Sequence, residues 1–275
     1  MAGTLILCAT PIGNLGDISV RLTESLAACD HIYAEDTRRT GQLLNHLGIS
    51  KPMTSFFAGN QQSRIEGLTS RLANGEVVCL VTDAGMPVVS DPGAAAVSAA
   101  LEAGAEVTSV PGPSAVTMAL AVSGFGGDRF CFEGFLPRKG ADRSDRIRAL
   151  SAETRTVVFF AAPSRVAKDL TALAEHMPER GIVVAREMTK LHEEIWRGTV
   201  VAAAEEFSDP GRARGEFTVV IAPADEQAPS IEEAVNDTLG MIAEGVPTSD
   251  AVRQIAVQRG VSRRELYELV LRARS

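Results

Sequence analysis

Short apolar, β-branched runs alternate with segments of helical periodicity from the beginning of the chain. The run at Leu5–Ala9 precedes a helical pattern at Arg21–Ala28, and the run at His31–Ala34 precedes another at Gly41–Leu47. Strands that alternate with helices in this way form mostly parallel sheets with helices on their faces. The pattern therefore predicts an α/β protein.

A loop rich in proline and glycine, Pro111-Gly112-Pro113-Ser114, interrupts this alternation and indicates a domain boundary. A second series of apolar runs follows, at Arg129–Phe135, Thr156–Ala161, Ile182–Arg186 and Glu216–Ala222. We therefore expect two α/β domains, the first over residues 1–113 and the second over residues 114–224.

The remaining residues, 225–275, are predicted to form a helical C-terminal extension behind a linker at 223–229. Helical segments are expected at Ile231–Glu244, Thr248–Arg259 and Ser262–Arg272, with Ser262 as an N-cap and Gly260 as a C-cap. The spacing of the last two segments is similar to a helix-turn-helix, which would indicate a DNA-binding regulator. A short helical pair packed on the second domain is the simpler interpretation.

Composition is typical of a globular protein, with 45% apolar and 23% charged residues among 275. The net charge of −8 excludes a protein that coats nucleic acid through its overall charge, so any such contact must use local patches. Two patches of basic residues are visible, although each is also compatible with a solvated helix face. They are Arg138, Lys139, Arg143, Arg146 and Arg148, and then Arg253, Arg259, Arg263, Arg264, Arg272 and Arg274.

The sequence argues against membrane proteins, metalloproteins and two classes of nucleotide-binding protein. No apolar stretch reaches the ~18–20 residues that span a bilayer, so we expect no membrane association. The four cysteines and four histidines are scattered without metal-ligand spacing, which predicts buried thiols in a reducing cytoplasm and no bound metal. There is no Walker-type loop, and Gly124-Phe125-Gly126-Gly127 connects a helix to a strand, the reverse of a dinucleotide-binding motif.

Candidate chemistry lies in the loops after the strands of the first domain. Three of them, Thr10–Asp17, Thr82–Gly93 and Pro111–Ala115, are rich in glycine and proline, and Glu35–Arg39 is acidic at its start. Each loop alone is compatible with a tight turn. Because ligands bind beyond the carboxyl ends of parallel strands, three such loops on one sheet edge favour a binding cleft.

The motifs in these loops resemble the tetrapyrrole-methylase superfamily, and within it the branch that methylates the cytidine 2′-hydroxyl of small-subunit ribosomal RNA. The resemblance rests on motifs spread from the first strand to the last strand of the second domain. They are Ala9–Asp17, Ala34–Arg38, Thr82–Pro87, Asp91–Gly93, Pro111–Ser114, Phe132–Pro137, Ala185–Lys190 and Gly215–Phe217. Phe56–Gln61 and Ala161–Arg165 depart from the pattern of the branch.

The resemblance implies two α/β domains with S-adenosylmethionine in the cleft between them, a homodimer, and small-subunit ribosomal RNA, within the assembled subunit, as substrate. The donor contacts that it implies are Pro11, Asp83, Ala84, Gly85, Pro87, Ser114, Ala115, Phe160, Ala161 and Met188. Methyl transfer from a sulfonium to a ribose hydroxyl would be helped by a nearby base or cation. The candidates for this catalytic role are Asp36, Glu187 and Lys190.

A methyltransferase that acts on a precorrin or another small molecule is the alternative. The acidic net charge is compatible with it, whereas the arginines of the C-terminal helices favour RNA.

Overall fold

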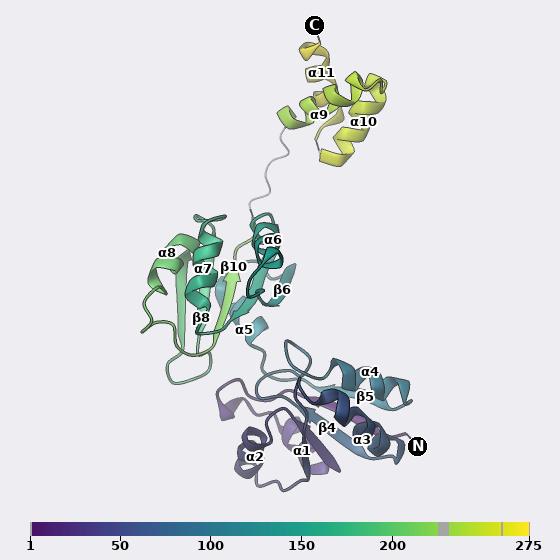
Figure 1. The fold of residues 1–275 in the computed structure, drawn as a ribbon, viewed down its shortest axis with the longest axis vertical. Coiled ribbons are helices and arrows are strands. Elements are labelled where there is room, and N and C mark those ends of the chain that lie inside the picture. The colour runs from purple at the N-terminus through teal and green to yellow at the C-terminus, as the bar shows by residue number, and fades with distance from the viewer. Residues whose placement is uncertain (1, 225–230, 260, 275) are drawn as a thin grey trace. The chain divides into compact units, whose positions relative to one another are not determined.

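The computed structural model describes residues 2–224, 231–259 and 261–274 (Figure 1). The chain divides into two compact units, Met1–Pro223 and Ala224–Ser275. The first unit contains two five-stranded sheets and the second is helical. The predicted α/β fold class is confirmed. The division of the first unit at residue 113 stays a prediction, and the linker residues 225–229 and the C-cap at Gly260 lie outside the described residues.

The first sheet is entirely parallel, in the order β3-β2-β4-β1-β5. Its strands are β1 (Thr4–Cys8), β2 (His31–Ala34), β3 (Met53–Ser55), β4 (Val77–Val81) and β5 (Glu106–Val110). Leu22, Leu26 and Leu43 of α1 (Val20–Ala28) and α2 (Thr37–His46) pack on one face. Leu68 and Ala96 of α3 (Gln61–Ala73) and α4 (Ala94–Glu102) pack on the other, so both faces are buried.

The second sheet has the order β6-β7-β10-β8-β9 and is mixed. Its strands are β6 (Phe130–Phe135), β7 (Thr156–Ala161), β8 (Gly181–Arg186), β9 (Glu194–Thr199) and β10 (Phe217–Ile221). Strand β10 runs antiparallel to both β7 and β8, and β9 pairs with β8 as a hairpin. The sequence pattern gave no sign of β9, because EIWRGT is only half buried and has no continuous apolar run.

Helices cover the second sheet unequally. The core on one face includes residues of α6 (Ala141–Ser151), α7 (Val166–Ala174) and α8 (Val200–Glu206). On the other face Val116, Ala119 and Leu120 of α5 (Ala115–Ser123) pack against Val158 and Val220 of the sheet. Since α5 directly follows the loop after β5, that loop carries the chain from the first sheet to the second.

The second unit consists of α9 (Ile231–Ala243), α10 (Thr248–Arg259) and α11 (Arg263–Ala273). Val252, Ile255, Leu266 and Val270 form its small core. The predicted helices are confirmed, and the Ser262 hydroxyl accepts a hydrogen bond from the backbone N–H of Glu265 as an N-cap. None of the described helices is long and apolar enough to cross a membrane.

Candidate active site

Backbone contacts bring the three loops at the carboxyl edge of the first sheet together. Thr10 and Gly85 exchange two N–H to carbonyl hydrogen bonds of 2.9 and 3.0 Å, which join the loop after β1 to the loop after β4. Gly112 of the third loop packs so closely on the first that an added Cβ would lie 2.9 Å from the Cβ of Ala9. The expected convergence of these loops is therefore confirmed.

Beyond this edge lies a largely apolar cavity of about 310 Å³, within the range of small-molecule sites. Both halves of the first unit contribute to its wall. The lining includes seven of the expected donor contacts, Ala84, Gly85, Ser114, Ala115, Phe160, Ala161 and Met188, together with Ile12, Ser90, Asp91, Phe135 and Glu216.

The other expected donor contacts lie elsewhere. Pro11 and Asp83 line a second cavity of about 200 Å³, beside Arg39 of α2, and Pro87 is in the wall of neither cavity. Thr10 lines the smaller cavity and Gly85 the larger one, so the backbone bridge between these two residues lies between the two cavities.

Gly85 has a left-handed backbone with φ of +78°. An added Cβ would lie 3.6 Å from Ile12 and 3.7 Å from the carbonyl oxygen of Pro113, which are ordinary contacts. The backbone conformation, and the approach of a ligand to the cavity wall, are therefore what favour glycine at this position.

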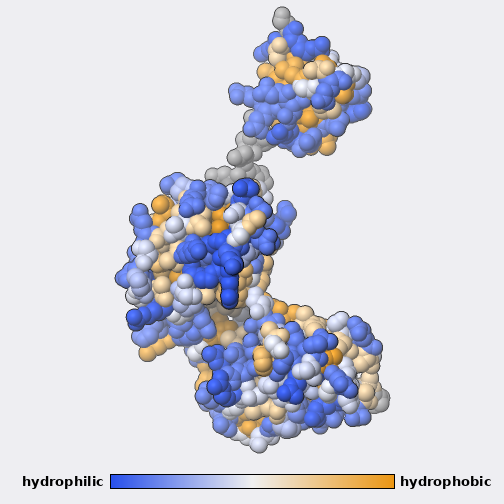
Figure 2. All heavy atoms as spheres, in the orientation of Figure 1, coloured by the Kyte–Doolittle hydropathy of each residue, from blue (hydrophilic) through white to orange (hydrophobic). Residues whose placement is uncertain are grey.

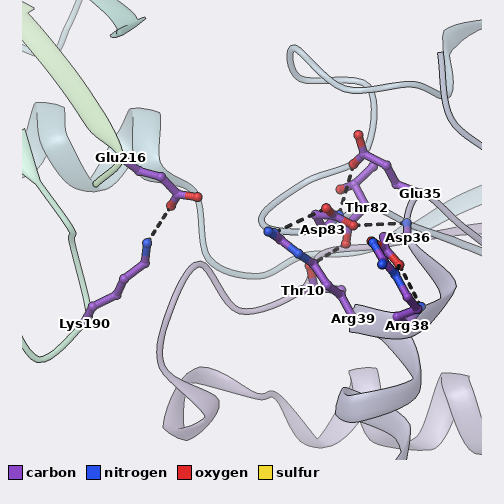
Figure 3. Close-up of polar contacts among 9 residues, drawn as sticks. All are labelled: Thr10, Glu35, Asp36, Arg38, Arg39, Thr82, Asp83, Lys190 and Glu216. Atoms are coloured by element: carbon purple, nitrogen blue, oxygen red, sulfur yellow. Dashed lines mark hydrogen bonds and ion pairs between the residues drawn. The ribbon is translucent and has the colours of Figure 1, made fainter. Parts of the chain in front are cut away.

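Asp36, the first of the three catalytic candidates, stabilises the start of α2. Its carboxylate accepts hydrogen bonds from the backbone N–H and the guanidinium of Arg38, at 2.7–3.1 Å (Figure 3). These bonds lower the pKa of Asp36 well below its usual range. Asp36 lines neither cavity. Its backbone N–H donates to Asp83, which also pairs with Arg39 at 3.3 Å.

Glu187 and Lys190, the other two candidates, lie together in the loop between β8 and β9. The Lys190 ammonium is 2.7 Å from the carboxylate of Glu187 and 2.9 Å from that of Glu216, a residue of the larger cavity wall (Figure 3). Burial alone would lower the pKa of Lys190, but the two carboxylates outweigh it and raise the pKa.

Glu187 shows the reverse balance, since burial would raise its pKa but Lys190 and the N–H of Glu216 lower it. Both charges of the pair are therefore held at neutral pH.

This loop also packs against the loop after β1 of the first sheet. An added Cβ at Gly13, in the loop after β1, would lie 2.4 Å from Cγ of Lys190 and 2.9 Å from the hydroxyl of Thr189. Glu187 and Thr189 both have positive φ, at 51° and 67°. None of the three candidates lines either cavity. Glu187 and Lys190 lie beside the larger one, next to Met188 and Glu216 of its wall.

Comparison with known proteins identifies the family. Residues 4–204 match the family described as Tetrapyrrole (Corrin/Porphyrin) Methylases. The chain belongs to this family. It is a methyltransferase, and the family implies a methyl donor of the S-adenosylmethionine type.

The curated relatives that match this chain well share one name within the family. The protein named ribosomal RNA small subunit methyltransferase I from Synechocystis is 44% identical over 273 residues, covering 98% of both chains. A relative of the same name from Thermotoga maritima is 48% identical over 219 residues, which are 98% of its length but 80% of this chain.

Solved structures of other methyltransferases share the fold. The methyltransferase CobJ has a TM-score of 0.62 at 21% identity, covering 82% of this chain and 95% of that chain. Uroporphyrin-III-C-methyltransferase from Thermus thermophilus has a TM-score of 0.56 at 17% identity, covering 80% and 94%. At these identities the similarity shows the fold alone.

One residue of the first basic patch, Arg143, is buried and was wrongly predicted to lie on the surface. Arg143 is 8% exposed, and its guanidinium donates to Asp169 at 2.6 Å and to the carbonyl oxygen of Pro137 at 3.1 Å. Arg165 contacts the same two oxygens at 3.1 and 3.0 Å. Arg143 is therefore a buried structural cation and not a phosphate contact. The sequence prediction was wrong because the basic residues around Arg143 on the same helix made it look like part of an exposed face.

Most other arginines of the two patches form ion pairs. Arg146 pairs with Glu133 at 2.6 Å, and Arg259 pairs with Glu233 and Asp237. In the described parts of the chain, the patch residues without an ion pair or side-chain hydrogen bond are Arg138, Lys139, Arg263 and Arg272. Hydrophilic residues gather over α6 and α7 in Figure 2, on the surface of the second domain.

Sequence reasoning missed four polar residues of the cavity wall. Ser90, Asp91, Glu216 and Thr218 all line it, although none was among the expected site residues. Asp91 and Glu216 belong to motifs that carry the family resemblance, so their position after β4 and before β10 was a usable signal. What spacing did not indicate is which side of each loop faces the cavity.

Proposed function

We propose that this methyltransferase transfers a methyl group from S-adenosylmethionine to the 2′-hydroxyl of a cytidine in small-subunit ribosomal RNA. The observation that carries the proposal is the cavity of about 310 Å³, whose wall is built from the segments that are characteristic of the family. The RNA substrate is supported by the name of relatives that match nearly the whole chain.

The donor would occupy the larger cavity. Phe160 and Met188 offer apolar surface to its adenosine and methionine parts, and the backbone at Ala84 and Gly85 can approach it closely. Pro11, Asp83 and Pro87 would contact the donor only at its margin, because they lie outside this wall.

Methyl transfer is an in-line displacement that consumes the positive charge of the donor, so alignment and exclusion of water contribute most. We propose no metal for this step. Lys190, held as a cation beside the cavity, would favour the ionised form of the acceptor hydroxyl, and Glu187 and Glu216 would position its ammonium. Asp36 is assigned the structural role that its contacts with Arg38 indicate.

RNA contacts are proposed for Arg138 and Lys139 and for Arg263 and Arg272 of the helical unit, since phosphate binding requires unpaired cations. The fifth of this chain that the Thermotoga relative does not match is close in size to the helical unit 224–275. We therefore assign that unit to substrate binding rather than to chemistry. A homodimer that acts in the cytoplasm on the assembled subunit completes the proposal.

Incubation with donor labelled in the methyl group tests the proposal. Small ribosomal subunits, the RNA extracted from them and a precorrin would be offered separately, and the labelled RNA digested to nucleosides. We expect label in 2′-O-methylcytidine. Label in the precorrin alone, or in a base-methylated nucleoside, would contradict the proposed acceptor.

A further inference from the structure

Two carboxylates contribute to the wall of the donor cavity, Asp91 and Glu216. Glu216 is 67% exposed at its side chain and pairs with Lys190. In the portion of the chain that the structure describes, Asp91 has no ion pair. An unpaired, half-buried carboxyl group in a largely apolar cavity is costly to maintain, which indicates a functional reason for its position.

The segment that carries Asp91 is strained. Val88 and Ser90 have φ of 79° and 65°, and for a β-branched residue such as valine this is a rare conformation. Gly93 packs against this turn, since an added Cβ would lie 3.1 Å from Val88. Ser90 lies against the second sheet, with its hydroxyl 3.2 Å from an added Cβ at Gly134 of β6. Strain of this kind persists where the surrounding structure fixes a functional group.

The surroundings of Asp91 raise its pKa towards neutral pH. Burial is the main cause, the carboxylates of Glu35 and Asp83 also raise the pKa, and the Thr82 hydroxyl lowers it, which together place the pKa of Asp91 at about 7. Glu35 is itself half-buried with a raised pKa, and Asp83 pairs with Arg39. Thr82 is 2% exposed, and its Oγ1 completes no hydrogen bond among the described residues.

We propose that Asp91 is the base that accepts the proton of the acceptor ribose hydroxyl, an assignment that rests on the proposed function. The hydroxyl oxygen forms a bond to the methyl carbon of the donor while the carbon–sulfur bond breaks. The electron pair of that bond stays on sulfur, which becomes a neutral thioether. The hydroxyl proton passes to the Asp91 carboxylate, which releases it to solvent after the product leaves.

The earlier candidates are less suited to this step. Arg38 and Lys190 hold the carboxylates of Asp36 and Glu187 ionised by lowering their pKa, so each is a weak base. General bases work best when their pKa lies near the operating pH, and they contribute ~10²–10⁴-fold to rate. Asp91 meets this condition and lies in the cavity wall.

Ionisation of Asp91 should make the rate of methyl transfer rise with pH. Only the ionised carboxylate can accept a proton, so below the pKa the active fraction falls tenfold per pH unit. The single-turnover rate of the wild-type protein should therefore rise up to about pH 7 and level off above it. Binding of the cationic donor would move this midpoint downward, because a nearby positive charge favours the carboxylate.

The test is single-turnover methyl transfer to small-subunit RNA by wild type, Asp91→Asn and the surface control Asp128→Asn, from pH 5.5 to 8.5. We expect Asp91→Asn to lower the plateau rate by ~10²-fold and to abolish the rise with pH, as loss of a general base predicts. Donor affinity by calorimetry should fall less than the rate does, although the ionised carboxylate also attracts the cationic donor. Asp128→Asn should match wild type.

Two results would overturn the assignment. One is an Asp91→Asn variant that keeps the wild-type rate, or loses rate only through donor affinity. The other is a wild-type rate that does not change between pH 5.5 and 8.5, a result that needs no variant to fold. Wild-type protein that methylates no RNA at any pH would instead refute the proposed function, and this assignment with it.

Discussion

The loop after β4 and the loop after β8 approach the same cavity from the two sheets of the first unit and share an unusual backbone. Each contains two non-glycine residues with positive φ, Val88 and Ser90 in one, Glu187 and Thr189 in the other. Their charges are arranged in opposite ways. Asp91 is left unpaired with a raised pKa, whereas Glu187 and Lys190 neutralise each other. The loop after β4 can therefore exchange a proton near pH 7, whereas the loop after β8 can only present fixed charge.

The largest effect is expected where the first of these loops forms the donor wall. Gly85→Val should abolish donor binding while the protein stays folded, since the side chain would enter the cavity and the left-handed φ resists a β-branched residue. Gly104→Val is the matched control, because Gly104 has φ of +74° and open space around it. Calorimetry that finds wild-type donor affinity in a folded Gly85→Val protein would contradict the proposed donor site.

The second effect separates fixed charge from proton transfer. Lys190→Ala should lower the single-turnover rate by ~10²-fold with both affinities near wild type, because the cation acts mainly as the hydroxyl loses its proton. It should keep the rise of rate with pH that Asp91→Asn loses. The exposed Lys168→Ala serves as control. A rate within a few-fold of wild type would reduce Lys190 to a structural ion-pair partner.

A smaller effect is expected from the helical unit. Protein that ends at Pro223 should keep donor affinity, because both sheets and the cavity wall belong to the first unit. Its affinity for small-subunit RNA should fall by about tenfold, the equivalent of ~1.4 kcal/mol. Binding measured by filter retention would show this, and unchanged affinity would place the RNA wholly on the first unit.

The smallest effect concerns Arg138 and Lys139. Replacing both with alanine should reduce the slope of log affinity against log salt by ~1–2, the loss of two phosphate contacts. The matched control is Arg148→Ala, since Arg148 pairs with Asp145 at 3.4 Å. Equal slopes in the double variant and wild type would exclude this patch from the RNA interface.

Sequence periodicity predicted most of the fold because buried strands such as Thr156–Ala161 read as continuous apolar runs. It missed β9, whose half-buried residues carry no such run, and the antiparallel return of β10, which depends on long-range pairing. For the site, motif positions located the cavity walls at Gly85, Ser114 and Met188.

Side-chain partners could not be predicted in the same way. Whether Asp36, Asp91 or Glu187 carries an available carboxylate depends on which cation lies beside it in space. Spacing along the chain does not encode that distance, and so Asp91 was missed while Asp36 was chosen.

The contacts of Asp169 limit the order in which neighbouring residues can be substituted. One carboxylate, 2% exposed, accepts hydrogen bonds from both Arg143 and Arg165, and both arginines also hold the carbonyl oxygen of Pro137. Losing Asp169 first would leave two guanidinium groups without a counter-charge, whereas losing Arg165 first would leave a balanced pair. Substitutions at these three positions are therefore epistatic, and their order decides which evolutionary paths are open to the protein.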